Sequence, residues 1–599
     1  MQALILAAGM GKRLKDLTRE NTKCMIRVNG ETLIERMLSQ LDRLGLSRIV
    51  LVIGYQGEKL KAFCEGLPVR TPLVFVENTD YETTNNIYSL YLARERLCED
   101  DTLLLESDLI FEDGILEALL SDERETLALV DRYESWMDGT CVRITTDDRI
   151  EAFIPKSRFR FEEIADYYKT VNIYKFSRHF SATHYVPFLD AYSRALGNNA
   201  YYEQVLRVIT MLDEPEIRAK RLCGELWYEI DDAQDLDIAA SMFVGDEDGK
   251  VDRIGGRFGG YWRYPGLLDF CYLVNPFYPP RRLMDELKAN FEKLVTNYPS
   301  GQEVQSLLAA KDFDLKTEQI VVGNGASELI SALFQRQTGK IGFIRPSFEE
   351  YKNRYPEDKC VFFDVRTSGF RYGAKELTDF FRDKELSALV LVNPDNPSGN
   401  YLSAAETKKL LTWTREQGIR LILDESFSDF SEEGKTFLDT KLLEAHPSLI
   451  VIKSISKSYG VPGLRLGLLA SGDRELIKRL KKEVSIWNIN SFAEFYLQIE
   501  EKYHDDYEEA LDKLRAERER FSDKLKALPK VTVFPSEANY LMVELKEPGG
   551  ARRLTRELLT KKSILVKDLT KKTGGEYLRL AIRLPQENDR LVKAMKELL

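Results

Sequence analysis

Two stretches of the sequence have the residue types and spacing that chemistry on phosphates and on amines requires. Residues 6–14, "LAAGMGKRL", place two glycines directly before Lys12 and Arg13. Residues 454–467, "SISKSYGVPGLRLG", place Lys457 among serines and ahead of Arg465. Glycines let backbone N–H groups approach a phosphate closely, and a lysine amine held beside a carbonyl compound can bond to it covalently. The first stretch indicates phosphate binding, and the second indicates covalent catalysis.

Carboxylates farther along the front half form a candidate metal site. Lys23 follows the glycine stretch, Asp108 ends an apolar run in "LLLESDLIF", and Glu229 and Asp231 lie two apart in "WYEIDDAQDL". Carboxylates from separate segments suit Mg²⁺, a hard cation that prefers oxygen ligands and often shares them with a triphosphate. Each feature alone has a plainer explanation, because a GxG is compatible with a tight turn and an acid with a cap or a surface charge. The combination favours a nucleotide site.

Other stretches of the back half supply further polar and aromatic groups that could act together with Lys457. Candidate phosphate ligands are Ser454, Ser456 and Arg465, together with Gly325, Ala326 and Ser327 of "NGASEL" at an expected helix start. An acid, an aromatic ring and an amide are offered by Asp424 of "LILDESF", Phe348 of "RPSFEEY" and Asn396 of "VNPDNPSG". These groups meet the needs of pyridoxal phosphate for phosphate donors, an acid at the ring nitrogen, a stacking partner and a donor to the ring oxygen. The lysine motif alone is also compatible with a glycine-rich turn after a strand.

The elements that must position these residues alternate between short apolar runs and helical patterns. Such alternation predicts α/β folds with mostly parallel sheets covered on both faces. This alternation stops in a stretch rich in glycine and charged residues, which we interpret as a linker. We therefore expect a first α/β domain at 1–243, a linker at 244–264 and a second α/β domain at 265–599. A small subdomain is expected from about Glu494 onward.

Length and composition limit the alternatives. The 599 residues exceed what one core supports, so two large domains are expected. The formal charge of −11 disfavours a broad nucleic-acid surface. Seven single cysteines indicate reduced thiols in a cytoplasm, and no apolar run of about eighteen residues predicts a membrane span. The N-terminal apolar run lacks a preceding basic region and is interpreted as a first strand instead of a signal peptide.

Residues 1 to about 240 resemble the sugar-nucleotidyltransferase-like superfamily, through LAAGxGxRL, the downstream lysine, the strand-end Asp and the late E-I-D. They look closest to the phosphocholine cytidylyltransferase branch, because "NTDYETTNNIYSLYLA" and "KTVNIYKFS" resemble segments of it; Thr22 replaces a proline found in many relatives. The resemblance implies CTP as the nucleotide and Mg²⁺ held by Asp108 and Asp231, with Glu229 as a further acid. It implies nucleotide binding by Leu6, Ala8, Gly9, Gly11, Arg13, Lys23, Asn86 and Ser89, with Arg13 and Lys23 also stabilising the transition state.

The segment "NNAYYEQVL" is a candidate for binding an ammonium group of the acceptor. Tyr201 and Tyr202 offer aromatic faces, and Glu203 offers a carboxylate. Packing on an amphipathic helix is an equally good interpretation of these residues.

The back half resembles the fold-type I pyridoxal-phosphate enzymes, specifically the class I/II aminotransferases, over about residues 265 to 599. The resemblance implies that Lys457 bonds covalently to the cofactor and moves the proton, that Asp424 keeps the pyridine nitrogen protonated, and that Asn396 binds the ring oxygen. It also implies a homodimer. Histidinol-phosphate aminotransferase and threonine-phosphate decarboxylase look most similar, although Phe427 stands where many aminotransferases have tyrosine.

Two arginines in "YLRLAIRLPQEN" are candidate substrate ligands. By the same resemblance Arg579 clamps an amino-acid carboxylate, since a planar guanidinium pairs with it through two bonds. Arg583 is interpreted either as a ligand for a substrate phosphate or phosphonate, or as half of a surface ion pair.

The whole chain is similar to fusions of a phosphonate cytidylyltransferase with a 2-aminoethylphosphonate transaminase. The implied function is transamination of phosphonoacetaldehyde to 2-aminoethylphosphonate with an amino-acid donor. Coupling to CTP would then give CMP-2-aminoethylphosphonate and pyrophosphate. The alternative is a phosphocholine cytidylyltransferase fused to an enzyme like threonine-phosphate decarboxylase or histidinol-phosphate aminotransferase. The acceptor, the amino donor, the transfer of intermediate between domains and the dimer interface stay open at this stage.

Overall fold

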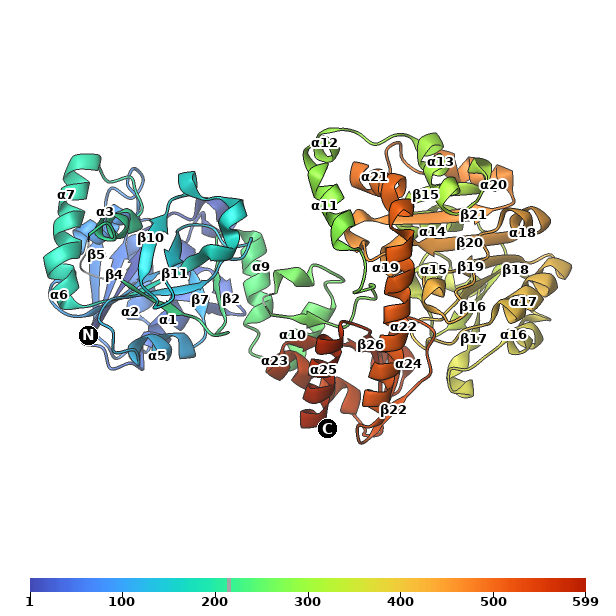
Figure 1. Cartoon of the computed structure of the whole chain (residues 1–599). Coiled ribbons are helices and arrows are strands. Elements are labelled where there is room, and N and C mark those ends of the chain that lie inside the picture. The colour runs from blue at the N-terminus through green and yellow to red at the C-terminus, as the bar shows by residue number, and fades with distance from the viewer. Residues whose placement is uncertain (213–216, 265) are drawn as a thin grey trace. The chain divides into compact units, whose positions relative to one another are not determined.

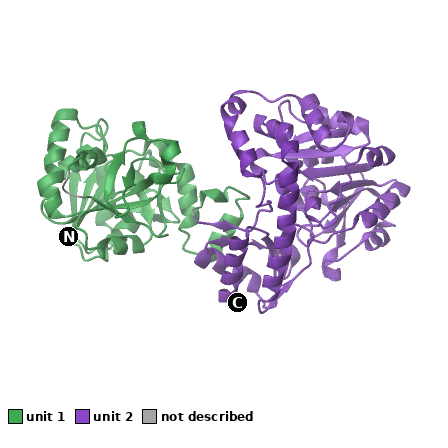
Figure 2. Ribbon diagram, viewed as in Figure 1, with its two compact units in different colours: residues 1–265 green, residues 266–599 purple. Residues whose placement is uncertain are grey.

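The chain divides into two compact units, each built around its own sheet (Figure 2). The computed structural model describes residues 1–212, 217–264 and 266–599. One unit comprises residues 1–265 and the other residues 266–599. The expected first residue of the second domain, 265, lies outside the described residues. Within the described ranges, no helix is long and apolar enough to cross a membrane.

The first unit is organised around a nine-stranded mixed sheet (Figure 1). Its central strands run parallel in the order β6-β1-β4-β5, and antiparallel strands extend the sheet beyond β6. The strands of this sheet are β1 (Gln2–Ala7), β4 (Ile49–Ile53), β5 (Leu73–Glu77), β6 (Thr102–Glu106), β8 (Leu127–Arg132), β9 (Cys141–Ile144), β10 (Ile150–Ile154), β11 (Tyr167–Phe176) and β12 (Arg218–Arg221).

Helices and two short ribbons complete the first unit. The helices are α1 (Leu33–Asp42), α2 (Gly57–Glu65), α3 (Asn86–Leu92), α4 (Arg94–Leu97), α5 (Gly114–Leu120), α6 (Arg178–Phe180), α7 (Val186–Leu196), α8 (Glu203–Ile209), α9 (Ala233–Met242) and α10 (Glu247–Gly255). The ribbons pair β2 (Arg27–Val28) with β3 (Glu31–Thr32), and β7 (Leu109–Phe111) with β13 (Trp227–Glu229).

Both faces of this sheet are covered, as its continuous apolar strands predict. In β1, Ala3 and Ile5 pack into one core cluster, whereas Leu4 and Leu6 pack into a second. Alternate side chains of a strand point to opposite faces, so the two clusters lie on opposite sides of the sheet. The predicted α/β fold class of the front half is confirmed.

The segment 244–264, which we predicted as a linker, differs from that prediction. It contains α10, and its arginines bind residues of the first unit. Arg253 donates to Asn29 Oδ1 at 3.0 Å, and Arg257 donates to Ser241 Oγ at 2.7 Å. Charge and glycine in this stretch therefore reflect a capped surface helix and its turns instead of an irregular connection.

The second unit has a seven-stranded sheet in the order β15-β21-β20-β19-β18-β16-β17. All neighbours are parallel except β21, which runs antiparallel to β15 and to β20. The strands are β15 (Ile320–Asn324), β16 (Lys340–Arg345), β17 (Cys360–Asp364), β18 (Leu386–Val392), β19 (Arg420–Asp424), β20 (Leu449–Ser454) and β21 (Leu466–Ser471). Leu421 and Leu423 pack on one side of the sheet and Ile422 on the other.

A four-stranded antiparallel sheet forms the expected small subdomain. Its strands are β22 (Val531–Val533), β23 (Tyr540–Leu545), β26 (Tyr577–Ala581) and β25 (Lys567–Asp568), and β14 (Leu268–Asp269) pairs with β24 (Ile564–Leu565). The helices of this unit are α11 (Arg281–Ala289), α12 (Phe291–Thr296), α13 (Gln302–Asp312), α14 (Ala326–Phe334), α15 (Glu349–Asn353), α16 (Ala374–Phe381), α17 (Ala404–Glu416), α18 (Thr440–Ala445), α19 (Ile455–Ser458), α20 (Arg474–Glu483), α21 (Ser491–Ile499), α22 (His504–Lys526), α23 (Gly550–Lys562), α24 (Thr570–Thr573) and α25 (Pro585–Leu598).

Replacing Leu105 tests how much core packing in the first unit stabilises β6, the strand that ends at Glu106. The Leu105 side chain is fully buried in β6, so Leu105→Ala is expected to lower the free energy of unfolding of the first unit by about 2 to 5 kcal/mol. Urea unfolding followed by circular dichroism measures the change. Leu196→Ala, at a side chain that is 72% exposed, is the control and should change little. Equal effects of the two substitutions would contradict the placement of β6 in the core.

Candidate functional site

The glycine stretch forms the loop between β1 and a 3-10 helix at Lys12–Thr18. Gly11 adopts φ 59°, and a Cβ there would lie 3.0 Å from Thr18 Cγ2 and 3.2 Å from Lys23 Cβ. Both the backbone conformation and the close approach require glycine at this position. The loop borders a cavity of about 790 Å³. All eight predicted nucleotide-binding residues line this cavity, namely Leu6, Ala8, Gly9, Gly11, Arg13, Lys23, Asn86 and Ser89.

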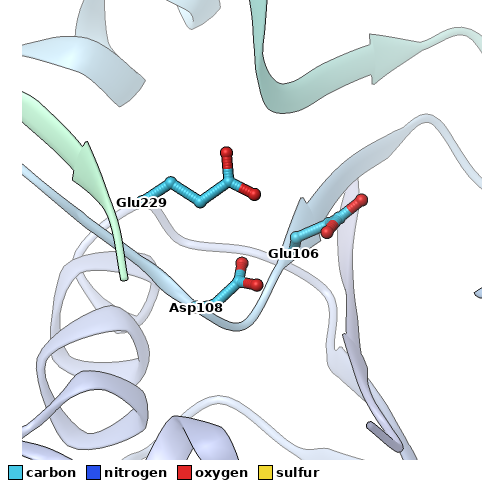
Figure 3. Close-up of side chains that lie close together, drawn as sticks. All are labelled: Glu106, Asp108 and Glu229. Atoms are coloured by element: carbon cyan, nitrogen blue, oxygen red, sulfur yellow. The ribbon is translucent and has the colours of Figure 1, made fainter. Parts of the chain in front are cut away.

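Three carboxylates meet on one side of this cavity (Figure 3). Glu106 ends β6, Asp108 follows two residues later, and Glu229 ends β13. Each offers an oxygen within 4.8 Å of the others. Glu106 was missed in the sequence, although it stands beside Asp108 in "LLLESDLIF" and could have been found from that spacing.

These carboxylates have the chemistry of a site for a hard divalent cation. Asp108 is 9% exposed, and its Oδ1 atom has no hydrogen-bond partner among the described residues. Burial raises the pKa of Glu229 to about 7, with Asp108 and Asp231 adding to the rise and Lys169 opposing it. Burial, with Asp108 next in weight, also raises the pKa of Glu106 well above its ordinary value. A cation bound here would relieve this repulsion, so the donor set fits Mg²⁺.

Lys23 bridges two of the predicted acids. Its Nζ atom lies 2.5 Å from Asp108 Oδ2 and 2.7 Å from Asp231 Oδ1. Burial alone would lower the pKa of Lys23, but the two carboxylates outweigh burial and raise it. Arg13 adds a second contact to Asp231 Oδ1 at 2.9 Å. Asp231 therefore lies with the cations, outside the group formed by Glu106, Asp108 and Glu229, and the metal roles of Asp108, Glu229 and Asp231 stay predictions.

The predicted substrate residues of "NNAYYEQVL" separate in the structure. Tyr202 is fully buried and packs edge-on against Tyr174 with ring centroids 5.7 Å apart, so the prediction that it offers a face to the substrate is wrong. The helix-packing interpretation holds for Tyr202, because it directly precedes α8 and its side chain packs into the core. Tyr201 and Glu203 line the cavity instead. Glu203 is 4% exposed, and its Oε2 atom has no hydrogen-bond partner among the described residues.

Lys457 lies in α19, immediately after β20 of the second unit. Its pKa is lowered to about 8, because burial and the positive charges of Arg579 and Arg465 disfavour the ammonium form. Asp424 ends the neighbouring β19 and accepts a hydrogen bond at 2.7 Å from the hydroxyl of Tyr351. Adjacent strand ends thus place the predicted lysine and the predicted acid at one edge of the sheet.

Glycine and arginine shape the predicted phosphate cradle. Gly325 has φ 73°, and a Cβ there would clash with the guanidinium of Arg465. Ala326 and Ser327 open α14, whose N-terminal N–H groups suit an anion. The buried Ser456 Oγ has no hydrogen-bond partner among the described residues, and Ser454 N donates to Ser426 Oγ at 3.0 Å. An open helix start, an unpartnered hydroxyl and a positive group fit the phosphate of pyridoxal phosphate.

Arg579 and Asn396 lie together, as the predicted substrate and cofactor ligands should. Arg579 Nη1 donates to Asn396 Oδ1 at 2.6 Å, and its Nη2 donates to the carbonyl of Cys271 at 2.8 Å. Arg579 makes no ion pair with a described carboxylate, so it is available for an external one. Arg583 lies beyond the end of β26 and pairs with Glu587 at 3.1 Å, in agreement with the ion-pair alternative.

The two predicted aromatic positions differ in exposure. Phe348 is partly exposed and packs edge-on near Tyr351, with ring centroids 6.1 Å apart. Phe427 is buried, and the Nζ atom of Lys457 lies 6.0 Å from its ring centroid. Phe427 therefore fills the space beside the lysine without offering a hydroxyl, and the stacking role of Phe348 stays a prediction.

Comparisons with known proteins match both units. Residues 269–595 match the family model for aminotransferase class I and II, and residues 3–172 match that for the MobA-like NTP transferase domain. The CMP-5'-(3-aminopropyl)phosphonate synthase of Streptomyces rubellomurinus is 30% identical over 603 residues, which cover 100% of this chain and 95% of that protein.

Some relatives match only the second half. The L-serine phosphate decarboxylase of Sulfurospirillum multivorans is 32% identical over 348 residues, covering 55% of this chain and 88% of that protein. A solved structure of a decarboxylase from Sulfurospirillum multivorans has a TM-score of 0.53 and 31% identity, covering 57% of this chain and 90% of that one.

The lowered pKa of Lys457 predicts how the apoprotein combines with pyridoxal phosphate. Only the uncharged amine is nucleophilic, so the rate of recombination should rise with pH and level off above about 8. Absorbance measured from about pH 6 to about pH 10 gives the profile. Arg579→Gln removes a neighbouring positive charge, which should raise the pKa of Lys457 and move the profile to higher pH. A flat profile, or a move to lower pH, would contradict this assignment.

Proposed function

The chain belongs to the class I and II aminotransferase family through its second unit and carries a nucleotidyltransferase domain in its first; from this premise we propose that it makes a CMP-linked aminoalkylphosphonate. The supporting observation is that one chain holds both a cavity lined by a glycine loop, cations and acids and a half-buried lysine that follows the strand next to the one ending in Asp424. A relative that matches over the full length is named for a product of this class.

In the first unit, we propose CTP-dependent cytidylyl transfer to a phosphonate. A phosphonate oxygen attacks the α-phosphorus of CTP, the bond from that phosphorus to the bridging oxygen breaks, and pyrophosphate leaves. Lys23 and Arg13 neutralise the charge on the phosphates, and the loop at Gly9 and Gly11 holds them. Glu106, Asp108 and Glu229 would hold Mg²⁺, which supplies further charge neutralisation. The attacking oxygen is already anionic, so a general base is not required.

The acceptor's ammonium group has proposed partners in the same cavity. Glu203 offers an unpartnered carboxylate oxygen, and Tyr201 offers an aromatic face that is 55% exposed. Both interactions favour a cation. We propose that they recognise the amine of 2-aminoethylphosphonate.

In the second unit, we propose transamination of phosphonoacetaldehyde to 2-aminoethylphosphonate. When bound, pyridoxal phosphate supplies an electron sink for the carbon that loses a proton. Asp424 holds the ring nitrogen protonated, Asn396 binds the ring oxygen, and Arg579 orients the carboxylate of an amino-acid donor. Lys457 removes the proton from one carbon atom and returns it to another, because its depressed pKa keeps a useful fraction of the amine uncharged near neutrality.

A second candidate for this unit is decarboxylation of an amino acid that carries a phosphate or phosphonate. It is favoured by the likeness to the L-serine phosphate decarboxylase and to the solved decarboxylase structure. Arg579 would then orient the carboxylate that leaves. The corresponding alternative for the first unit is phosphocholine as the acceptor.

We also propose that the chain acts as a homodimer in the cytoplasm. Exposed aromatic pairs support self-association of the second unit, because Tyr298 stacks on Trp487 at 4.4 Å and Phe291 lies 5.5 Å from Phe492. Tyr298 is 80% exposed, which is costly for a large aromatic side chain without a partner. All seven cysteines are unpaired, in keeping with a reducing compartment.

Pyrophosphate release tests the proposed acceptor. With CTP and Mg²⁺, the chain should prefer 2-aminoethylphosphonate to phosphocholine and phosphoethanolamine. Lys23→Met should lower kcat/KM by about 10²- to 10³-fold, because it removes the cation between two carboxylates of the cavity. Lys59→Met, at an exposed lysine outside the cavity, is the matched control. Preference for phosphocholine would contradict the phosphonate assignment.

Amino-donor dependence separates transamination from decarboxylation. Transamination predicts that an amino donor alone shifts the absorbance of the bound cofactor and that phosphonoacetaldehyde restores it. Each half-reaction should be lost in Lys457→Ala. Decarboxylation predicts CO₂ release from a phosphono- or phospho-amino acid without any carbonyl acceptor. Release of CO₂ with no effect of phosphonoacetaldehyde would replace the first candidate by the second.

A further inference from the structure

Lys169, in β11, is a charged side chain that the proposed chemistry of the first unit does not use. It is 0% exposed, and its ammonium group is enclosed among described side chains. Nζ donates to the carbonyl of Thr170 at 2.6 Å and to Asn172 Oδ1 at 3.3 Å, and it lies 3.4 Å from Glu229 Oε2. Burying a lysine is costly unless its charge is compensated, so the groups that compensate it identify what it does.

The compensating groups are carboxylates that line the nucleotide cavity. Glu229 lies closest, and Glu106 and Glu203 are the other acids whose charges outweigh the burial of Lys169 and raise its pKa. Glu229 and Glu106 also belong to the group that includes Asp108. Lys169 therefore lies behind the carboxylates of the proposed metal site.

Irregular backbone in β11 brings a second group to Glu229. The pairing of β11 with β8 shifts between Thr170 and Tyr174, and Asn172 adopts φ 60°. Its Nδ2 atom lies 3.4 Å from Glu229 Oε1, while its Oδ1 atom accepts hydrogen bonds from Lys169 Nζ and from Thr170 Oγ1. One strand thus contacts each oxygen of Glu229 separately. A left-handed residue within a strand costs free energy that the surrounding structure must offset.

These features are poorly explained if Lys169 only stabilises the fold of the first unit. A buried ion pair is often no more stable than a well-packed apolar pair of similar volume. Here three acids, the buried Glu203 and the half-buried Glu106 and Glu229, face one buried lysine, so Lys169 compensates only part of their charge. Asp108 Oδ1, in the same group of carboxylates, has no hydrogen-bond partner among the described residues and is free to accept further positive charge.

We propose that Lys169 is a positioning residue for the cation site: it orients Glu229 toward Glu106 and Asp108 and supplies the charge that keeps these carboxylates together. Lys169 contacts neither the nucleotide loop nor the acceptor residues and acts through Glu229. The inference deepens the proposed cytidylyl transfer, on which its catalytic consequence rests. Groups that orient metal ligands typically change metal affinity or activity by about 10- to 100-fold when they are removed.

Binding of Mn²⁺, used in place of Mg²⁺, tests this role without any turnover. Free Mn²⁺ is measured by electron paramagnetic resonance with the full chain, in the presence and absence of CTP. Lys169→Met should weaken Mn²⁺ binding by about 10- to 100-fold. Lys175→Met is the matched control, because Lys175 lies on the same strand and donates to the carbonyl of Asp122 instead of a carboxylate of the cavity. Its Mn²⁺ affinity should equal that of the wild type.

A double-mutant cycle distinguishes positioning from a general structural effect. If Lys169 acts through Glu229, then Lys169→Met should weaken Mn²⁺ binding little further in a Glu229→Gln background. Additive losses would overturn the inference, and so would wild-type affinity in Lys169→Met. If Lys169→Met does not fold, Lys169→Gln replaces it, since glutamine keeps a donor for Glu229 but lacks the charge. Unchanged Mn²⁺ binding in that variant would likewise overturn the inference.

Failure of this inference is distinguishable from failure of the proposed function. A wild-type chain that releases no pyrophosphate from CTP with any acceptor, but whose Mn²⁺ binding depends on Lys169, would refute the proposed reaction and support the positioning role. A chain that is active with CTP, but binds Mn²⁺ equally well with and without Lys169, would support the proposed reaction and refute the positioning role. A wild-type first unit that binds no Mn²⁺ would overturn the positioning role.

Discussion

Parallel pairing of β1 with β6 is the interaction on which the front site depends. The register sets Leu6 opposite Glu106, so the glycine loop after β1 and the acids after β6 leave the sheet side by side. Neither strand could slip by one residue without turning its apolar side chains to the wrong core. The position of these candidate site residues is therefore fixed by the same packing that stabilises the sheet. In the second unit, β19 and β20 are likewise parallel neighbours, and they end in Asp424 and Ser454 at the same edge of the sheet.

The second constraint is that buried charges must be compensated. The two units differ in the sign of the charge that is in excess. In the first unit, Lys23 and Lys169 each face more than one carboxylate, so acids are in excess. In the second unit, Lys457 lies near the positive charges of Arg579 and Arg465, so cations are in excess. An excess of acids suits a bound cation, whereas an excess of cations suits the phosphate and carboxylate groups of a cofactor and substrate.

Local motifs were sufficient to predict residues that the fold brings together at each candidate site, because the glycine loop and the lysine motif each place several groups within one turn. The predictions that failed depended on orientation. Tyr202 and Tyr201 are adjacent in the chain, but only Tyr201 lines the cavity, because Tyr202 packs into the core ahead of α8. Glu106 was overlooked because an acid at a strand end is common. Lys169 and Lys175 are the two charged residues of the run "YYKTVNIYKF", and nothing in that run identifies Glu229 as the partner of Lys169.

The sequence by itself determined the two α/β units, the order of their strands along the chain, and the chemical types of the groups at the strand ends. These follow from local periodicity and from short motifs, which need no knowledge of distant segments. Only the tertiary structure decided that residues 244–264 contain α10 and belong to the first unit, and that Asp231 pairs with Lys23 and Arg13. Only the tertiary structure brought the carboxylate of Glu229 close to those of Glu106 and Asp108. Pairing between segments more than a hundred residues apart is set by sheet register and by the mutual compensation of buried charges, and neither is written in any local stretch.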